Sequence, residues 1–293
     1  MISVIITTYG EIGTIKKAID VILPQLTTKD EVLIVSPDRL MGAVVEDCRK
    51  KYKNIYLFYD KGVGKPSALN LVLQKARGDI LVLTDGDVYM SNQAIYFLKK
   101  SFTDNNVGAV SGHPVSVEDQ TKMFGYWSYL LANEAHQIRL KKDNFASFLE
   151  CSGYLYAIRQ GLITKVPEDA LAEDAVISHV IANAGFKIKY APKAYVSVKY
   201  PKNYKDWLRQ KIRSAGGYTQ TYVLKSKYKM RTFWGEFFTG PKIFFQYPKN
   251  IKQIFWIIIL LMARLHLWAL IVFKVRLQKQ SLLKLWKRVE STK

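Results

Sequence analysis

The sequence is poor in cysteine, and its two cysteines lie far apart. Among 293 residues only Cys48 and Cys151 carry thiols, and their separation fits neither a metal-binding pair nor a disulfide framework. We therefore expect a reducing, cytosolic environment. Glycine and proline are not enriched, and 49% of the residues are hydrophobic. This composition excludes a collagen-like or disordered chain and allows a substantial buried core.

Acidic residues are scarce in the last third of the chain. Residues 201–293 contain 20 Lys or Arg but only 3 Asp or Glu, a net charge of +17, whereas residues 1–200 carry +3. Charge of one sign confined to one end favours an anionic partner at that end, either nucleic acid or an acidic membrane surface.

A long apolar run favours the membrane over nucleic acid. Residues 254–273 form a run of 20 in which only Arg264 and His266 are polar, a length that matches the hydrocarbon core of a bilayer. Lys and Arg flank the run on both sides, which conflicts with a single crossing because basic residues collect on one side of a membrane. Spanning, re-entrant and in-plane arrangements stay open, and the alternative is a buried helix of a soluble domain.

Two neighbouring segments also suit a membrane surface. Residues 232–247 hold seven aromatic side chains interrupted by Gly and Pro, which is typical of an interfacial segment. Residues 274–293 mix Leu and Trp with Lys and Arg, so they form either a basic amphipathic helix or a solvated terminal one. No signal peptide is visible at the start of the sequence, and we expect the first 230 residues on the cytosolic side.

The first two hundred residues alternate between strand and helix patterns. Short apolar, β-branched runs predict strands at residues 2–7, 31–35, 55–59 and 79–84. Helical spacing of apolar residues follows the first three of them, at residues 14–26, 40–51 and 67–76. This alternation predicts a parallel sheet covered by helices on both faces. Ligands of such sheets bind beyond the carboxyl ends of the strands.

The loop after the third predicted strand resembles a phosphate-binding loop only superficially. Residues 62–67 read GVGKPS, but Tyr59 stands where the first glycine belongs, and Pro66 separates Lys65 from Ser67. Lys65 either faces a phosphate at the ligand edge of the sheet or is a solvated loop residue.

Two carboxylates follow the fourth predicted strand directly. Asp85 and Asp87 flank Gly86 at the rim of the sheet, where a glycine allows close approach of a ligand. Hard oxygen ligands in this place suit Mg²⁺ or Mn²⁺ bridging a diphosphate. The alternative is a turn in which Asp has its usual capping role.

A second acidic pair begins a predicted helix. Apolar spacing from Ala175 to Ile181 places Glu173 and Asp174 in the first turn, where the helix dipole favours ionised carboxylates. Such a carboxylate can act as a general base. Taken alone, this segment fits ordinary charge complementation of the helix end better than a catalytic role.

A third patch lies on a predicted helix that begins near Tyr204. Trp207, Gln210 and Arg213 follow one another at three-residue steps and are expected to share a face. An aromatic ring, an amide and a cation together suit sugar stacking and diphosphate binding. A basic helix lying on a membrane or in solvent is the alternative.

In this order and spacing, the motifs resemble those of the family 2 glycosyltransferases, which have the GT-A nucleotide-diphospho-sugar transferase fold. The resemblance covers roughly residues 1–220. Its motifs are residues 3–9 (SVIITTY), 64–70 (GKPSALN), 76–79 (ARGD), 85–87 (DGD), 152–159 (SGYLYAIR), 171–174 (LAED), and 185–186 followed by 190–192. It implies an inverting transfer of a sugar from a nucleotide diphosphate.

The resemblance also implies roles for the donor-side residues. The nucleoside pocket would be lined by Thr7, Thr8, Tyr9 and Glu11, with Lys65 close by. Asp85 would contact the nucleotide, and Asp87 would bind the metal ion, Mg²⁺ or Mn²⁺.

Acceptor-side roles follow in the same way. Asp174 would remove the proton from the acceptor hydroxyl, with Glu173 and Trp207 on the acceptor side. Gln210 and Arg213 match the first part of the Gln-x-x-Arg-Trp element of membrane-bound synthases, where they would bind the donor.

The sequence departs from the family pattern in two places. Ser214 replaces the tryptophan of that element, which argues against processive polymerisation. Residues 35–38 read VSPD where consecutive acidic residues are usual, so the nucleotide base is not identified.

We therefore expect a GT-A catalytic domain over residues 1–225 and a membrane-associated helical region over residues 226–293. The predicted activity transfers a sugar from a UDP- or GDP-linked donor to a hydroxyl of a lipid-linked saccharide or glycan. It would occur at the cytosolic face of an anionic membrane, without a nucleic-acid partner. The alternatives are a polyprenyl-phosphate sugar synthase, a processive polysaccharide synthase, and a membrane-tethered protein that binds anionic ligands without catalysis.

Overall fold

The computed structural model describes residues 1–218, 220–228 and 246–273. The chain forms two compact units, which are described separately. Unit 1 comprises Met1–Val115 and His136–Val198, and unit 2 comprises Ser116–Ala135 and Lys199–Lys293. This division differs from the boundary at residue 225, which stays a prediction.

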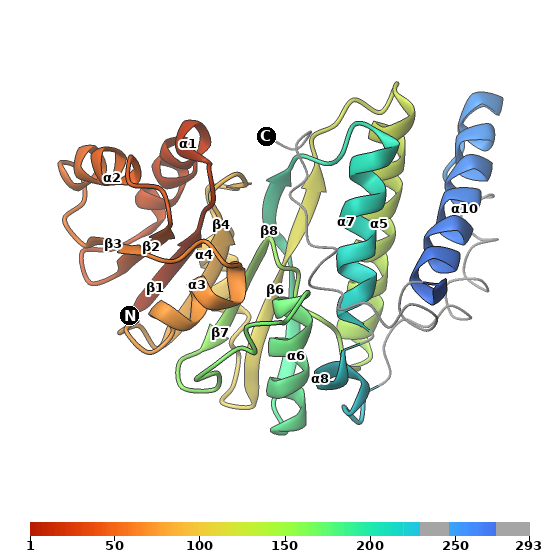
Figure 1. The fold of residues 1–293 in the computed structure, drawn as a ribbon. Helices are drawn as coiled ribbons and strands as arrows, with labels where there is room; N and C mark the ends of the chain where they lie inside the picture. Colours follow the sequence, from red (N-terminus) through yellow and green to blue (C-terminus); the bar gives the residue numbers. More distant parts are fainter. Residues whose placement is uncertain (219, 229–245, 274–293) are drawn as a thin grey trace. The chain divides into compact units, whose positions relative to one another are not determined.

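Unit 1 is built on one mixed sheet of eight strands (Figure 1). In chain order these are β1 (Ile2–Thr7), β2 (Glu31–Ser36), β3 (Ile55–Tyr59), β4 (Ile80–Asp85), β5 (Tyr89–Met90), β6 (Val107–Ser116), β7 (Leu155–Arg159) and β8 (Lys187–Val198). The strand order is β3-β2-β1-β4-β7-β6-β8-β5. Pairing is parallel from β3 to β4, whereas β7 joins both β4 and β6 antiparallel. Parallel pairing therefore holds for the four strands that the alternation predicted.

Helices of unit 1 connect these strands and pack on the sheet. They are α1 (Ile12–Ile22), the short 3-10 helix η1 (Leu23–Gln25), α2 (Met41–Arg49), α3 (Lys65–Val72), α4 (Ala94–Lys100), the end of α5 (Met123–Asn144) and α6 (Glu173–Asn183). All six residues of β1 and of β2 are buried, as expected for strands inside a parallel sheet. Helix α3 begins two residues earlier than predicted, because Pro66 fits the first turn of a helix.

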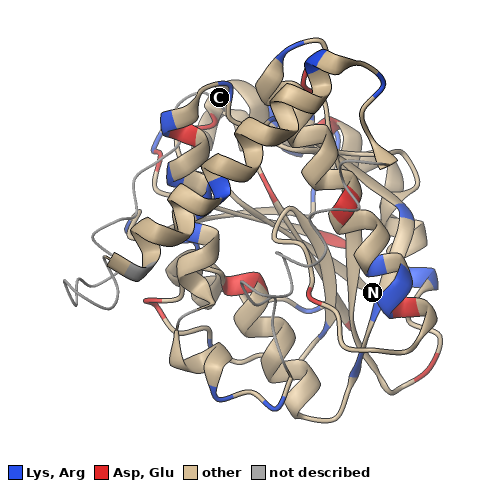
Figure 2. Cartoon of the chain, turned by 90° about the vertical axis from the view of Figure 1, so that its right-hand side faces the viewer, with Lys and Arg blue, Asp and Glu red and all other residues tan. Residues whose placement is uncertain are grey.

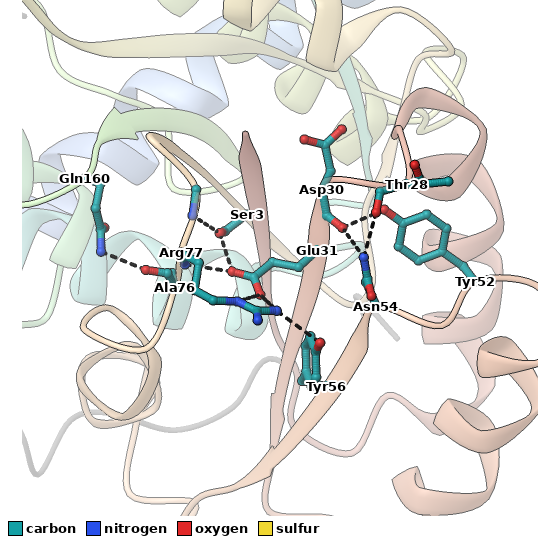
Figure 3. A network of polar contacts seen from close by, with 11 residues as sticks. Ser3, Thr28, Asp30, Glu31, Tyr52, Asn54, Tyr56, Ala76, Arg77 and Gln160 are labelled. Atoms are coloured by element: carbon teal, nitrogen blue, oxygen red, sulfur yellow. Dashed lines mark hydrogen bonds and ion pairs between the residues drawn. The ribbon is translucent and has the colours of Figure 1, made fainter.

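The amino ends of the parallel strands are joined by a polar network (Figure 3). The carboxylate of Glu31, 1% exposed, accepts hydrogen bonds from the Ser3 hydroxyl and from the backbone and guanidinium of Arg77. Gly78 lies so close to β1 that a Cβ atom would stand 2.4 Å from the backbone nitrogen of Ser3. The ARGD motif is thus structural, and it lies at the end of the sheet opposite to the ligand edge.

Unit 2 is helical in its described part. It contains the start of α5, α7 (Tyr204–Gly217), α8 (Thr221–Leu224) and α10 (Ile251–Val272). The inner face of α10 packs through Ile257, Leu260 and Ala263 on α5 and on Trp207 of α7, and through Leu267 and Ile271 on α7. The indole nitrogen of Trp127 in α5 donates a hydrogen bond of 2.8 Å to the backbone oxygen of Trp256. These contacts hold the three helices together.

Helix α10 contains most of the apolar run at residues 254–273. Residues Ile251–Ile271 are long and apolar enough to cross a bilayer, with a mean hydropathy of 2.2. The basic tail at residues 274–293 lies outside the described residues, as does the aromatic segment 232–247 except for its last two residues.

Candidate active site

The carboxyl ends of the parallel strands bring the predicted donor-side residues together. Thr7 ends β1 and Asp85 ends β4, and the two residues are paired across the sheet. The Thr7 hydroxyl donates a hydrogen bond of 3.0 Å to Asp85 Oδ1. Because β1 and β4 are parallel neighbours, the loops that follow them meet at one edge.

Lys65 lies at the centre of a charged cluster at this edge. Its ammonium group is 2.7 Å from Asp85 Oδ1 and 3.0 Å from Glu173 Oε1, and it donates a hydrogen bond of 2.9 Å to the Gly153 carbonyl. The side chains of Lys65, Asp85 and Glu173 are 22%, 23% and 12% exposed. Burial acts to lower the pKa of Lys65, but the two carboxylates outweigh it and leave that pKa raised. Lys65 therefore stays charged, and it is not a solvated loop residue.

Asp174 stands beside this cluster in the first turn of α6. Its Oδ2 accepts a hydrogen bond of 2.8 Å from the Gly153 backbone nitrogen. A Cβ atom at position 153 would lie 3.0 Å from the same oxygen, so the close approach favours glycine there. Burial, followed by the charge of Glu173, raises the pKa of Asp174 to about 7, against the opposing influence of Lys65. A carboxylate of this kind is a stronger base than an exposed Asp.

The turn after β4 is tightly packed. Gly86 donates a backbone hydrogen bond to Thr7, and its carbonyl accepts one from the Thr14 hydroxyl. A Cβ atom at Gly86 would lie 2.9 Å from both Glu11 Oε2 and Thr8 Cβ. The hydroxyl of Thr8 is buried and finds no hydrogen-bond partner among the residues that the structure describes. Asp87 lies in the same turn as Gly86. Thr8 and Glu11, in the loop after β1, lie beside this turn.

The described residues fit a divalent metal only in combination with a ligand. Nowhere in the described ranges do three or more His, Cys, Asp or Glu side chains group so that they could hold an ion. Asp85 and Asp87 offer hard oxygen atoms at the sheet edge, and Mg²⁺ commonly binds through one or two carboxylates plus the phosphates of a substrate. The donor set therefore suits a metal shared with a diphosphate.

The loops after β1, β2 and β3 form the neighbouring part of the edge. Tyr9 is 47% exposed, and a Cβ atom at Gly62 would meet its ring and Pro37 at 3.2 Å. Asp38 Oδ2 accepts a hydrogen bond of 2.6 Å from the backbone nitrogen of Gly10. Asp60 Oδ2 accepts a hydrogen bond of 3.1 Å from the backbone nitrogen of Gly62. Burial raises the pKa of Asp60. Asp60 was not among the predicted site residues, although its position after the third strand could have indicated it.

Trp207, Gln210 and Arg213 belong to unit 2 and differ in their environments. Trp207 is 3% exposed within the apolar cluster of α5, α7 and α10, and its indole nitrogen has no hydrogen-bond partner in the described part of the chain. Gln210 is also buried, whereas Arg213 is exposed. The expectation that the three share one face is therefore wrong, because six residues along a helix turn Arg213 well away from Trp207.

Trp207 and Gln210 do share a small pocket of unit 2. The lining residues are Phe124, Ser128, Leu131, Tyr200, Pro201, Trp207, Gln210 and Lys211. The acceptor-side role of Trp207 and the donor-side roles of Gln210 and Arg213 stay predictions.

A mixed α/β sheet of this topology, with acidic residues at the carboxyl ends of its parallel strands, defines a GT-A-like fold. Residues 3–161, more than half of the chain, match the profile of glycosyl transferase family 2. The chain belongs to this family.

Two relatives extend the match beyond the profile. A probable glycosyltransferase, YdaM, from Bacillus subtilis is 29% identical over 241 residues, which are 76% of this chain and 56% of the relative. A poly-beta-1,6-N-acetyl-D-glucosamine synthase from Staphylococcus aureus is 22% identical over 236 residues, which are 74% of this chain and 54% of the synthase. The chain thus spans about half the length of these relatives.

Solved structures resemble the chain in fold. A mannosyltransferase, PcManGT, from Pyrobaculum calidifontis in complex with GDP-Man and Mn²⁺ has a TM-score of 0.62 and 21% identity, and the match covers 97% of this chain and 82% of that one. Residues 1–349 of S. aureus TarS in complex with UDP-GlcNAc give a TM-score of 0.53 and 17% identity. This match covers 78% of this chain and 68% of the TarS chain. At these identities the likeness establishes the fold alone.

Proposed function

We propose that the protein is a metal-dependent, inverting glycosyltransferase that uses a nucleotide-diphospho-sugar donor. The observation that carries this proposal is that a fixed cation and a carboxylate with a raised pKa lie close together at one edge of the sheet. Lys65 is held as a cation between Asp85 and Glu173, and Asp174 has its pKa raised toward neutrality. Groups with pKa values shifted by specific neighbours in this way are typical of catalytic sites.

In the proposed reaction the acceptor hydroxyl gives its proton to Asp174 Oδ1 or Oδ2. The acceptor oxygen forms a bond to the anomeric carbon of the sugar, the bond from that carbon to the diphosphate breaks, and its electron pair leaves with the diphosphate. Attack opposite to the leaving group inverts the anomeric centre. The sugar gains oxocarbenium character as the bond breaks, so the reaction needs a base on one side and positive charge on the other.

Lys65 supplies fixed positive charge in a partly buried place, where it acts more strongly than in water. The backbone nitrogen of Gly153 holds Asp174 by one carboxylate oxygen, which restricts the orientation of the other. When bound at Asp87 together with the diphosphate, Mg²⁺ or Mn²⁺ would offset the charge that develops on the leaving group. The PcManGT complex with GDP-Man and Mn²⁺ supports this part of the proposal.

For the acceptor we propose a hydroxyl of a lipid-linked saccharide or glycan at the cytosolic membrane face. The net charge of +17 in residues 201–293 and the apolar helix α10 support attachment to an anionic bilayer. An enzyme held at the surface that confines its acceptor meets that acceptor more often. The similarity to a poly-N-acetylglucosamine synthase supports a glycan product, whereas Ser214 in place of tryptophan argues against processive synthesis.

A screen of nucleotide-sugars with the detergent-solubilised chain tests the proposal. We expect Mn²⁺- or Mg²⁺-dependent release of UDP or GDP from one donor class, increased by an acceptor extract from membranes. Nuclear magnetic resonance of the product gives the anomeric configuration. Absence of turnover and of metal-dependent nucleotide binding with every donor would leave the non-catalytic alternative as the better account.

A further inference from the structure

Helix α10 has a second apolar face, opposite to the one that packs on α5 and α7. Its members follow one another at steps of four or three residues, so they form one stripe along the helix. This outer stripe consists of Ile251, Phe255, Ile258, Met262 and Leu265, which are 72%, 61%, 40%, 55% and 53% exposed.

A stripe of this kind is unusual on a surface that faces water. Single exposed apolar side chains are common, but contiguous rows of large ones mark sites of interaction with a protein or a membrane. Between Ile254 and Leu265 every exposed residue of α10 is apolar. In Figure 2, where only charged residues are coloured blue or red, α10 is tan over most of its length.

We propose that the outer stripe of α10 lies in the plane of an anionic bilayer surface, so that α10 is an interfacial helix and does not cross the membrane. The proposal rests on the membrane attachment proposed above, and it names the surface that makes the attachment. The outer stripe enters the boundary between headgroups and acyl chains, and the inner face stays packed on unit 2.

The partners of the inner face argue against a crossing. Helix α10 packs on α5 and α7 from Ile257 to Ile271, which is most of its length. A crossing α10 would therefore carry α7 into the hydrocarbon core. Helix α7 contains Lys205, Asp206, Arg209, Lys211 and Arg213. Charged side chains are disfavoured at that depth, and exposed ones on α7 would meet lipid directly.

The basic flanks argue in the same direction. Lys249 and Lys252 stand at the start of α10, and Lys274, Arg276 and Lys279 follow its end in the sequence. A crossing would place these two groups on opposite sides of the membrane, against the positive-inside tendency. An in-plane helix places both groups at the headgroups of one leaflet, where each cation attracts anionic lipid.

Labelling of both helix ends tests this arrangement. Lys249→Cys and Phe273→Cys are each introduced into the full chain, expressed in bacteria, and treated with a membrane-impermeant maleimide. The two native cysteines are buried, and the unaltered chain gives their background. We expect labelling of both positions in sealed inside-out vesicles and of neither in intact spheroplasts. Labelling of only one position from each side would show a crossing and overturn the proposal.

A binding experiment tests the stripe itself. The purified chain is mixed with phosphatidylcholine vesicles that contain or lack phosphatidylglycerol. The double variant Ile258→Gln, Met262→Gln should bind the anionic vesicles about tenfold more weakly or worse, whereas Leu40→Gln, at a 70% exposed apolar position of unit 1, should not change binding. Unchanged binding by the double variant would overturn the proposal.

A different occupant of the stripe would give a different result. If a second copy covered it, the unaltered chain would be a dimer that the double variant dissociates, and this outcome would also overturn the proposal. None of these readouts needs turnover. Failure of the labelling pattern therefore leaves the proposed sugar transfer standing, and an inactive chain can still lie in the membrane plane.

Discussion

Replacing Glu173 by glutamine should move the pH dependence of the reaction in a direction set by Asp174. Glu173 is the immediate neighbour of Asp174, and its negative charge is one of the causes that raise the pKa of Asp174. The glutamine side chain keeps the size and loses the charge. In Glu173→Gln the pKa of Asp174 should therefore fall.

The size of the shift follows from Coulomb's law. Two unit charges roughly 6 Å apart at an effective dielectric constant of about 20 interact by about 3 kcal/mol, which corresponds to about two pKa units. Because the cluster is partly open to water, we expect about one unit. Starting from a pKa of about 7, Asp174 is ionised in roughly one molecule in ten at pH 6, and in the variant in roughly one in two. The rate at pH 6, relative to the alkaline plateau, should rise about fivefold.

The assay is the pH profile of kcat/KM for nucleoside diphosphate release, measured with the donor that the screen identifies. Glu168→Gln is the matched control, because it makes the same change of charge at an exposed position five residues earlier. This control should leave the acidic limb of the profile in place. If the acidic limb of Glu173→Gln stays where it is or moves to higher pH, Asp174 is not the titrating base.

Three further predictions concern single residues. Asp174→Asn should lower turnover by roughly 10²- to 10⁴-fold while calorimetry shows nucleotide binding retained; near-native transfer would exclude Asp174 as the base. Asp87→Asn should remove the Mn²⁺ dependence of nucleotide binding, and an unchanged metal titration would place the ion elsewhere. Glu31→Gln should reduce the free energy of unfolding in urea by roughly 2–3 kcal/mol. Hydrogen bonds from Arg77 and Ser3 outweigh burial and lower the pKa of Glu31, so this stabilisation is present above the ordinary Glu pKa and is lost as the pH falls through the folded-state value. Equal stability of Glu31→Gln and the unaltered chain would contradict this account.

The parallel half of the sheet could be predicted because its signals are local. The strands Ile2–Thr7 and Ile80–Asp85 are largely apolar on both faces, as buried parallel strands must be. A carboxylate at the carboxyl end of such a strand lies at the sheet edge, so the position of Asp85 followed from the pattern. The first-turn position of Glu173 and Asp174 followed from the apolar spacing behind them.

The contacts within the cluster could not be predicted in the same way. Lys65 meets Asp85 and Glu173, which are far away in the sequence. Strand β7 pairs antiparallel with β4, and Gly153, just before β7, contacts both Lys65 and Asp174. Local sequence around Lys65 fits a solvated loop equally well. Only the pairing of distant strands decides that this lysine is a partly buried, ion-paired cation, and strand pairing at such separations leaves no periodic signal.

The apolar run that became α10 shows a different limit of sequence reasoning. Hydropathy adds up the side chains of a segment without regard to what covers each of them, so a helix with one face on protein and another on lipid scores like a span. In α10, Ile257 and Ile258 are neighbours in the sequence, yet the first is buried in unit 2 and the second is 40% exposed. Because the two residues are one position apart on a helix, they lie on different faces of α10. Under the proposed in-plane arrangement, the placement of α10 at the membrane depends on its packing on the charged helix α7, and the length of the run alone does not determine it.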